Sequence, residues 1–341
     1  MKQYLEKLMN REDLTIDEMK AATNSCFSNT ITDSEIAAFL TALRSKGETS
    51  DEITGIVEVI RSHSELSSIK LPNVMDNCGT GGDKSYSFNI STTAAFVIAG
   101  AGVTVAKHGN RSISSKTGSA DVLEHLGVSL SFSKGHVEEM LHENNISFLF
   151  APHVHAKLKP FSRIRRELGL PTIFNMIGPL TNPIALDSQL LGVYRREMLP
   201  VMAHSLKKLG RKRAIVVNGA GFMDEASLAG ENEIILLDDG DLIPYTLHPE
   251  ELNLPTYSND AIIGGDAKDN AEILLNVLKG KQGAYLDTVL LNAALGLFAN
   301  GIAATTQIGL DMAKESIHSG AAMEKLQRLI DFSNKNTHEV I

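Results

Sequence analysis

The sequence contains no tryptophan, and only 5% of its 341 residues are aromatic. Large flat side chains on which single-stranded nucleic acid could stack are therefore scarce. A basic excess is also missing, because the net charge is −9 at pH 7, so phosphate backbones and anionic membranes would be repelled. We expect no nucleic-acid partner and no membrane partner, although a few local cations can still hold a small anionic ligand.

Cysteine and long apolar runs are scarce as well. The two cysteines, Cys26 and Cys78, make no disulfide framework, and no histidine or asparagine pattern supports Cys78 as a catalytic thiol. Residues 1–13 are charged throughout and lack the apolar core of a signal peptide. The most apolar stretch, residues 94–105, is too short to span a bilayer. We therefore expect a cytoplasmic protein.

Residues 1–65 have the pattern of small amphipathic helices. Three capping boxes of the form Thr-x-x-Glu occur, at Thr15 and Glu18, Thr32 and Glu35, and Thr49 and Glu52. After the second and the third capping box, apolar residues recur at i, i+3, i+4 and i+7, which predicts one buried stripe on each helix. These apolar faces need partners, either from later segments or from another subunit.

From residue 71 onward, short apolar strands, glycine-rich turns and helices follow one another, which is typical of an α/β domain. We expect strands at residues 103–106, 146–150, 189–194 and 213–217. We expect helices at residues 91–102, 120–126, 199–209, 284–299 and 313–330. Between the two α/β runs, residues 151–183 form a proline-rich insertion longer than ordinary loops, and its arginines, histidines and phenylalanines favour a functional role.

The strongest local feature is the glycine-rich segment of residues 76–83. Gly79, Gly81 and Gly82 allow successive backbone N–H groups to face one way, which makes a concave site for phosphate oxygens. The segment is neither a Walker loop nor a Rossmann fingerprint. Taken alone, it could equally be a tight turn.

Polar residues follow where an alanine-rich helix should begin. Asn89, Ser91, Thr92 and Thr93 lie at that helix start, where hydroxyl groups can cap the helix and also bind phosphate. A plain helix cap is the simpler interpretation. Because one cap is enough for a helix, four polar side chains favour a ligand of diphosphate size.

Two further features support the phosphate interpretation. Residues 107–121 follow a predicted buried strand and contain the cations Lys107, Arg111 and Lys116, and ligands of open α/β folds bind beyond the carboxyl ends of strands. Asp224 and Glu225 follow another predicted strand, and adjacent carboxylates suit Mg²⁺, although on their own they are common on surfaces.

Taken together, these segments resemble the anthranilate phosphoribosyltransferases. The resemblance covers the whole chain in order, through residues 79–83, 89–92, 107–111, 118–124, 174–183 and 224–225. It implies transfer of phosphoribosyl from 5-phosphoribosyl 1-diphosphate to the amino group of anthranilate, with release of diphosphate, in tryptophan biosynthesis.

The resemblance also implies an architecture. A small all-helical domain, of residues 1–70 and 155–185, would lie beside a large α/β domain of residues 71–154 and 186–341. The large domain would have a central, mostly parallel sheet, as in nucleoside phosphorylases. Members of the family usually form homodimers through the helical domain, which would provide the partner that the N-terminal helices need.

Residue roles follow from the same resemblance. Phosphoribosyl diphosphate would contact Gly79, Thr80, Gly81, Gly82, Asp83, Asn89, Ser91, Thr92, Lys107 and Ser119. Mg²⁺, expected as two ions per subunit, would be held by Ser91, Asp224 and Glu225. Anthranilate would contact Gly79, His108, Asn110, His155 and Arg165. The planar fork of Arg165 matches a carboxylate, whereas the run of residues 163–167 alone would favour a surface charge.

The expected chemistry needs charge neutralisation more than proton transfer. Departure of diphosphate leaves negative charge on the leaving group, for which Mg²⁺, Lys107 and backbone N–H groups are suited. The aniline nitrogen of anthranilate has a free lone pair at neutral pH, so no general base is nominated.

The chain departs from the usual family pattern at four positions. Ala156 stands where proline is usual, Pro171 where arginine is usual, Asn218 where histidine is common, and Phe222 where glycine is usual. These positions bear on the acceptor channel and on the loop before Asp224. Two other functions remain open from the sequence: a pyrimidine nucleoside phosphorylase, and a non-catalytic paralogue that binds nucleic acid.

Overall fold

The computed structural model describes residues 1–28, 30–112 and 116–336. Its centre is a seven-stranded sheet in the order β3-β2-β1-β4-β5-β6-β7. The strands are β1 (Val74–Gly79), β2 (Thr104–Gly109), β3 (Ile146–Phe150), β4 (Ser188–Gly192), β5 (Arg213–Asn218), β6 (Asn232–Asp238) and β7 (Asp241–Leu247). Neighbours from β3 to β5 pair in parallel, while β6 and β7 pair antiparallel. The predicted α/β class with a mostly parallel sheet is confirmed.

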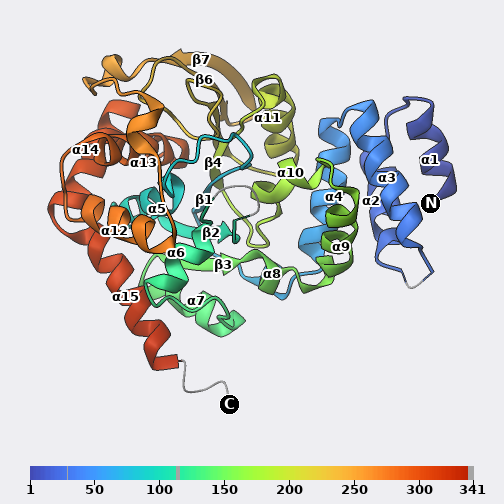
Figure 1. Cartoon of the computed structure of the whole chain (residues 1–341), viewed down its shortest axis with the longest axis horizontal. Coiled ribbons are helices and arrows are strands. Elements are labelled where there is room, and N and C mark those ends of the chain that lie inside the picture. Colours follow the sequence, from blue (N-terminus) through green and yellow to red (C-terminus); the bar gives the residue numbers. More distant parts are fainter. Residues whose placement is uncertain (29, 113–115, 337–341) are drawn as a thin grey trace.

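Helices cover both faces of this sheet and form a separate group at one end of the molecule (Figure 1). The N-terminal helices are α1 (Lys2–Met9), α2 (Ile16–Cys26), α3 (Asp33–Lys46) and α4 (Ser50–Ser62). The later helices are α5 (Ile90–Gly100), α6 (Ser119–His125), α7 (Lys134–Glu143), α8 (Ala151–Val154), α9 (Lys159–Leu168), α10 (Phe174–Ile177), α11 (Leu199–Lys208), α12 (Ala267–Leu278), α13 (Ala284–Asn300), α14 (Thr306–His318) and α15 (Ala321–Asn336). Within the described residues, none of these helices combines the length and the apolarity needed to cross a bilayer.

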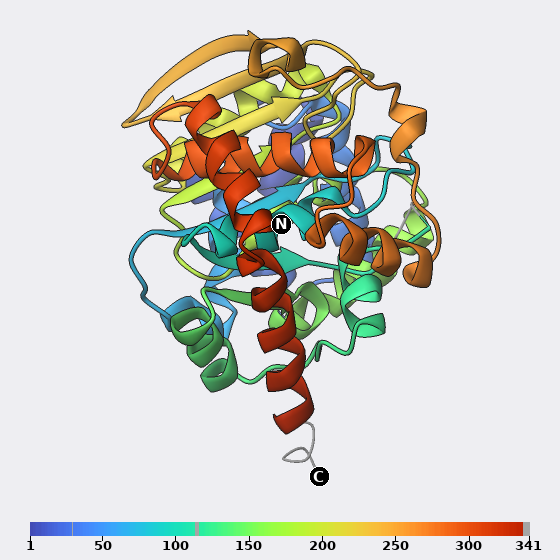
Figure 2. The ribbon, with the colours of Figure 1, turned by 90° about the vertical axis from the view of Figure 1, so that its left-hand side faces the viewer.

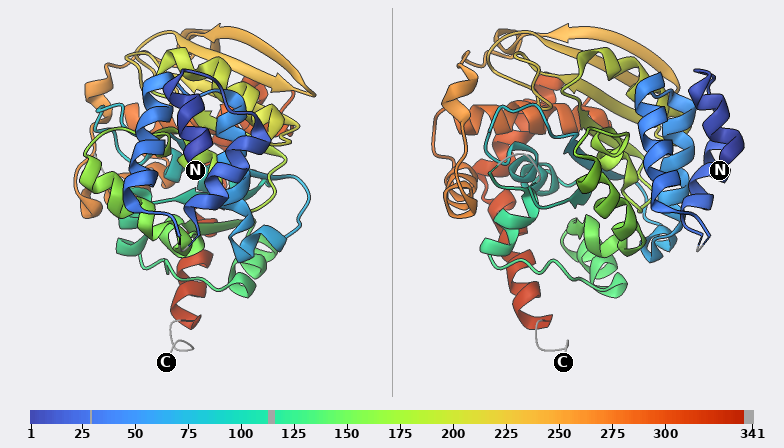
Figure 3. Two further views of the ribbon diagram at one scale, coloured as in Figure 1. Left: turned by 90° about the vertical axis from the view of Figure 1, so that its right-hand side faces the viewer. Right: turned by 45° about the vertical axis from the view of Figure 1, so that its right-hand side comes forward.

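The central strand β5 is buried on both faces because its alternate side chains join two different cores. Ile215 and Val217 of β5 pack into the core that contains α5 and α13. Ala214 and Val216 of the same strand pack with α11 and the N-terminal helices. Figure 2 shows α13 and α15 in front of the sheet, and Figure 3 shows helices α1–α4 on the opposite side. The helical group is therefore anchored on one face of the sheet.

The N-terminal helices form as the sequence predicts. All three predicted capping boxes are present, with each threonine accepting from the N–H of its glutamate and each glutamate accepting from the threonine N–H. The apolar stripe of α3, residues 36, 39, 40 and 43, is buried, and so is that of α4, residues 53, 56, 57 and 60. These caps satisfy N–H groups that a helix start otherwise leaves unpaired.

Two predictions about the second half were incomplete or wrong. The hairpin of β6 and β7 was missed, although Asp239 and Gly240 at its tip adopt the positive φ angles, 44° and 96°, of a tight hairpin turn. The helix predicted over residues 313–330 is two helices, α14 and α15. They separate at Gly320, whose φ of 80° ends the first.

Candidate active site

A cavity of about 750 Å³ opens beyond the carboxyl ends of β1 and β2 and reaches the segment of residues 151–181. Every residue to which the family resemblance assigns a binding role lines it: Gly79, Thr80, Gly81, Gly82, Asp83, Asn89, Ser91, Thr92, Lys107, His108, Asn110, Ser119, His155, Arg165, Asp224 and Glu225. Parallel strands place their carboxyl ends at one edge of a sheet, which explains why loops distant in sequence meet here.

The glycine-rich turn after β1 faces a carboxylate of the protein itself. Gly81 and Gly82 have φ angles of 71° and 88°, which are easy only for glycine. The Gly81 N–H donates to Oδ2 of Asp224 at 2.6 Å, and the Thr80 N–H donates to the Gly192 carbonyl at 3.0 Å. The turn thus presents an N–H group to an oxyanion, the property that a phosphate oxygen would use.

Two glycines allow the loop that carries Asp224 to cross the strand ends. A Cβ on Gly79 would lie 2.2 Å from Oδ2 of Asp224, and one on Gly192 would lie 1.6 Å from the Asp224 carbonyl oxygen. Neither position can therefore carry a larger side chain without moving the loop. Sequence reasoning missed Gly192, although a glycine near the end of a predicted strand was the available signal.

Burial and neighbouring carboxylates oppose the ionisation of Asp224 and Glu225. Burial, with the charges of Asp83 and Glu225, raises the pKa of Asp224 well above its ordinary value. Burial also raises the pKa of Glu225 to about 7, against the opposing effects of Lys107 and of hydrogen bonds from Ser91. Carboxyl groups that resist ionisation when grouped in this way are stabilised as anions by a bound cation.

The donor set fits magnesium better than a transition metal. Within the described ranges, no group of three or more His, Cys, Asp or Glu side chains is arranged to hold a metal ion by itself. Mg²⁺ typically takes only one or two carboxylates and completes its shell with water and substrate phosphates. The pair Asp224 and Glu225, with the Ser91 hydroxyl nearby, supplies hard oxygen atoms of this kind.

Lys107 places a buried cation beside the acidic pair. It lies in β2 with 3% of its surface exposed, and its Nζ donates to the Asn77 carbonyl. The Asn77 side chain in turn donates to the Ser91 carbonyl at 2.8 Å, which links β1 to the start of α5. Cys78, next to Asn77, is no nucleophile, because burial raises the pKa of its thiol to about 12.

The start of α5 differs from the prediction in one respect. The N-cap is Asn89, and no hydroxyl side chain caps the helix. The Asn89 amide instead donates to the Thr117 carbonyl at 3.3 Å and accepts from Asn270 at 2.9 Å, while the Thr93 hydroxyl donates to the Asn89 carbonyl. The expected hydroxyl cap was therefore wrong, and Ser91 and Thr92 are left to line the cavity.

The loop after β2 offers the cavity fewer available cations than its composition indicates. Arg111 is bound to Asp121 at 2.9 Å and to Glu124 at 2.7 Å, so it holds the loop on α6. Lys116 does not line the cavity. Residues 113–115, part of the same predicted phosphate loop, lie outside the described residues, whereas Ser119 lines the cavity and donates to the Asn110 carbonyl at 3.2 Å.

The other end of the cavity is formed by two histidine rings. His108 and His155 lie edge to face with 5.4 Å between ring centroids, and both are buried. Burial lowers the pKa of His155 to about 4 and that of His108 well below its ordinary value, the latter with a contribution from His155. Both rings are therefore neutral at pH 7, and neither Nε2 atom has a hydrogen-bond partner among the described residues.

Arg165 presents a cation at this same end. Its guanidinium lies 5.2 Å from the centre of the Phe174 ring, and burial lowers its pKa with no acidic group opposing that effect. Arg163, two residues earlier, instead pairs with Asp33 on the surface. Of the three arginines of α9, Arg163, Arg165 and Arg166, only Arg165 lines the cavity.

The four positions at which the family resemblance leads us to expect another residue fall at two places in the structure. Pro171 lines the cavity, and Ala156 begins the short 3-10 turn that follows His155. Asn218 ends β5, and Phe222 adopts a φ of 62°, the region that favours glycine. Two departures therefore bear on the acceptor end, and two lie next to the loop of the acidic pair.

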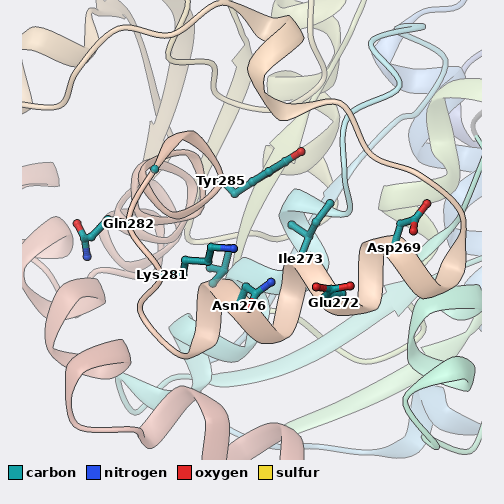
Figure 4. Close-up of a pocket in the computed structure, with 9 residues that line it drawn as sticks. Asp269, Glu272, Ile273, Asn276, Lys281, Gln282 and Tyr285 are labelled. Atoms are coloured by element: carbon teal, nitrogen blue, oxygen red, sulfur yellow. The ribbon is translucent and has the colours of Figure 1, made fainter.

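A second hollow, of about 350 Å³, lies between α12 and the start of α13 (Figure 4). Its side chains include Asp269, Glu272, Lys281 and Tyr285. It shares no lining residue with the larger cavity.

Comparison with known proteins agrees with this geometry. Residues 71–323 match the glycosyl transferase family α/β domain, and residues 2–64 match the helical bundle domain of the same family. An anthranilate phosphoribosyltransferase from Oceanobacillus iheyensis is 57% identical over 335 residues, covering 98% of each chain. One from Exiguobacterium sibiricum is 55% identical over 329 residues, covering 96% of this chain and 97% of the other.

The chain belongs to the anthranilate phosphoribosyltransferase family.

Solved structures of the family share the whole fold. The anthranilate phosphoribosyltransferase of Thermus thermophilus superposes with a TM-score of 0.92 at 37% identity, covering 97% of this chain and 99% of the other. That of Saccharomyces cerevisiae, in complex with PRPP and Mg, gives a TM-score of 0.88 at 29% identity, covering 98% and 97%. The predicted family resemblance is confirmed.

Proposed function

We propose that the chain transfers phosphoribosyl from 5-phosphoribosyl 1-diphosphate to the amino group of anthranilate and releases diphosphate, as a step of tryptophan biosynthesis. One observation carries the proposal: a single cavity joins an oxyanion-accepting turn and an acidic pair to Arg165, for which the described residues offer no acidic partner. A diphosphate-bearing donor at one end and a carboxylate-bearing acceptor at the other fit those two ends.

The diphosphate end would use backbone N–H groups together with polar and charged side chains. The proposed contacts are Gly79, Thr80, Gly81, Gly82, Asp83, Asn89, Ser91, Thr92, Lys107 and Ser119. Lys107 is a buried cation beside the strand ends, where charge of the leaving diphosphate would develop. Its role is electrostatic, because amides and a buried ammonium stabilise negative charge without proton transfer.

Mg²⁺ would be held by Ser91, Asp224 and Glu225, and we propose two ions per subunit. The S. cerevisiae relative has been solved with PRPP and Mg, and the raised pKa values of this acidic pair favour a bound cation. The metal would neutralise charge on the diphosphate. The protein's own part is to keep both carboxylates at the strand ends, with Gly79 and Gly192 leaving room for them.

Anthranilate would contact Gly79, His108, Asn110, His155 and Arg165. The S. cerevisiae relative has also been solved with 4-fluoroanthranilate. Arg165 would bind the carboxylate, since a guanidinium partly removed from water and lacking an acid gains most from an anion. Neutral His108 and His155 would orient the ring, and no residue is assigned as general base.

The assembly belongs to the same proposal. Residues 1–70 and 155–185 would form the helical domain, and residues 71–154 and 186–341 the α/β domain. A homodimer would form through the helical domain, where Met9 and Leu170 are exposed apolar side chains. We expect a cytoplasmic location.

The test uses the fluorescence of anthranilate. We expect its emission to disappear when the protein and Mg²⁺ are mixed with 5-phosphoribosyl 1-diphosphate. Glu225→Gln should lower turnover by about 100-fold or more, because it removes a charged metal ligand, while the melting temperature changes little. Unchanged fluorescence, together with phosphorolysis of a pyrimidine nucleoside, would instead identify a nucleoside phosphorylase.

A further inference from the structure

The loop between β5 and β6 carries the acidic pair and begins with a strained turn. Gly219 and Met223 exchange two backbone hydrogen bonds, at 2.9 and 3.2 Å, which close the turn. Phe222, inside it, has a φ of 62°. A non-glycine residue is disfavoured in this left-handed region, because its Cβ approaches the following carbonyl oxygen. Asp224 and Glu225 follow within three residues, so the state of this turn determines where their carboxylates lie.

The side chain of Phe222 is exposed to solvent, but it contacts an arginine. Its side chain is 60% exposed, and the Arg196 guanidinium lies 5.0 Å from the centre of its ring. A cation at this distance over an aromatic face is attracted by the negative face of the ring. The contact therefore offsets part of the backbone cost at Phe222.

Arg196 is itself held from two other directions. Its Nε donates to Oδ1 of Asn218 at 2.8 Å, and its Nη1 lies 3.4 Å from Oε1 of Glu233 in β6. The guanidinium thus contacts the end of β5, the start of β6 and the turn between them. Three contacts from three segments leave it little freedom.

Asn218 connects this arginine to the adjacent strand. It is fully buried, and its Nδ2 donates to the Val193 carbonyl at 2.8 Å and to the Tyr194 carbonyl at 3.2 Å. Those two residues follow β4, directly after Gly192, over which Asp224 passes. An amide side chain suits this position because its Nδ2 can donate to two carbonyl groups while its Oδ1 accepts from Arg196.

We propose that Arg196, Asn218 and Phe222 form a clasp that positions the loop carrying Asp224 and Glu225 for cation and diphosphate binding. These three are positioning residues, since none of them lines the cavity. The inference rests on the proposed function, because it assigns the acidic pair to the metal. Two of the three are departures from the usual family pattern, and Arg196 binds both of them.

The expected effect is on cation affinity more than on folding. When the clasp is broken, the turn can open, and only the fraction of molecules with the loop in place binds the cation. The apparent dissociation constant then rises by the reciprocal of that fraction. A weakened turn should also expose the Gly219 and Met223 amides to solvent exchange.

The chain contains a matched control at the opposite end of the same two strands. Arg213 stacks on Phe298 at 5.5 Å and pairs with Asp238, its cross-strand neighbour in β6. This cluster has the same chemistry as Arg196, Phe222 and Glu233. Because it lies at the start of β5, it has no contact with the acidic loop.

The experiment measures Mn²⁺ binding by electron paramagnetic resonance with inorganic diphosphate present. We expect Arg196→Ala to weaken binding about 10-fold and Phe222→Leu about 3-fold, from the loss of one cation–π contact and, for arginine, a hydrogen bond. The double variant should bind Mn²⁺ as tightly as Arg196→Ala does, because both substitutions disrupt the same clasp. Phe222→Tyr, which keeps the ring, should restore parental binding.

Hydrogen exchange of peptides covering residues 216–228 gives a second readout. Exchange should accelerate in Arg196→Ala and Phe222→Leu, and stay parental in Arg213→Ala. Parental Mn²⁺ binding by Arg196→Ala would overturn the clasp, as would an equal loss in Arg213→Ala. Glu225→Gln separates the two proposals. If that variant binds Mn²⁺ as the parent does, the assignment of the acidic pair to the metal fails. If its binding is weakened, that assignment stands, and the Arg196→Ala results test only the positioning role of the clasp.

Discussion

The two ends of the cavity are lined by different kinds of chemical group. At the diphosphate end, a glycine-rich turn and strand termini stand beside polar and charged side chains, under a loop that crosses Gly79 and Gly192. At the acceptor end, it consists of side chains, with two neutral histidines and an arginine held on Phe174. Gly79 and Gly192 at the first end therefore tolerate no added volume, whereas the second end depends on which chemical groups are present.

Adding one methyl group at Gly192 should have the largest effect. Its Cβ would lie 1.6 Å from the Asp224 carbonyl oxygen, so the acidic loop must move, and a displacement of about 1 Å can cost 100-fold in rate. We expect Gly192→Ala to lose at least about 100-fold in turnover. Gly135→Ala is the control, because the atom nearest to its added Cβ would be 3.9 Å away. The turnover of both variants is measured by steady-state kinetics. Full activity in Gly192→Ala would show that the loop adjusts freely.

His155 should make the acceptor end sensitive to acid. Burial lowers its pKa from 6.5 to about 4, so the unfolded chain binds the proton more tightly than the folded protein. The associated stability is complete above pH 6.5 and is lost as pH falls towards 4. At about 1.4 kcal/mol per pKa unit, the loss is on the order of 3 kcal/mol.

Urea unfolding between pH 7 and 4 measures this effect. His155→Gln should lose less stability over that range than the parent protein, by the amount that the buried histidine contributes. His142→Gln, on the exposed side of α7, should follow the parent curve. If the parent and His155→Gln curves are parallel, His155 is not the group responsible.

Arg165 should affect one substrate far more than the other. Loss of a charge-assisted pair costs about 1.5–3 kcal/mol, so we expect Arg165→Ala to raise the KM for anthranilate about 10- to 100-fold. The KM for phosphoribosyl diphosphate should change little. Arg163→Ala is the matched control, since that arginine pairs with Asp33 on the surface. An equal rise in both KM values would refute a role in carboxylate binding.

Arg111 should have the smallest effect, although it is a cation at the diphosphate end. Its guanidinium is already bound to Asp121 and Glu124 and is 45% exposed, and surface ion pairs contribute about 0–1 kcal/mol. We expect Arg111→Gln to change the KM for phosphoribosyl diphosphate by about 3-fold at most. A change as large as that expected for Arg165 would assign Arg111 to the phosphates.

The two ends also differed in how far sequence reasoning could reach. The diphosphate end follows from local patterns: glycines after a strand, polar residues at a helix start and an acidic pair after another strand. Even there, the asparagine cap of α5 and the role of Gly192 were not predicted, because both depend on which segments lie opposite. At the acceptor end, the residues came only from family resemblance, and the stacking of Arg165 on Phe174 had no local signature.

The sequence by itself determined the α/β class, the capped N-terminal helices and the residues of the phosphate turn. Those features depend on the spacing of nearby residues and on glycine's freedom at positive φ. Only the tertiary structure decided which cations are available, since Arg111 is bound to acids while Arg165 is not. It also decided that Arg196 joins Asn218 to Phe222, because strands and loops distant in sequence meet only when the sheet is assembled.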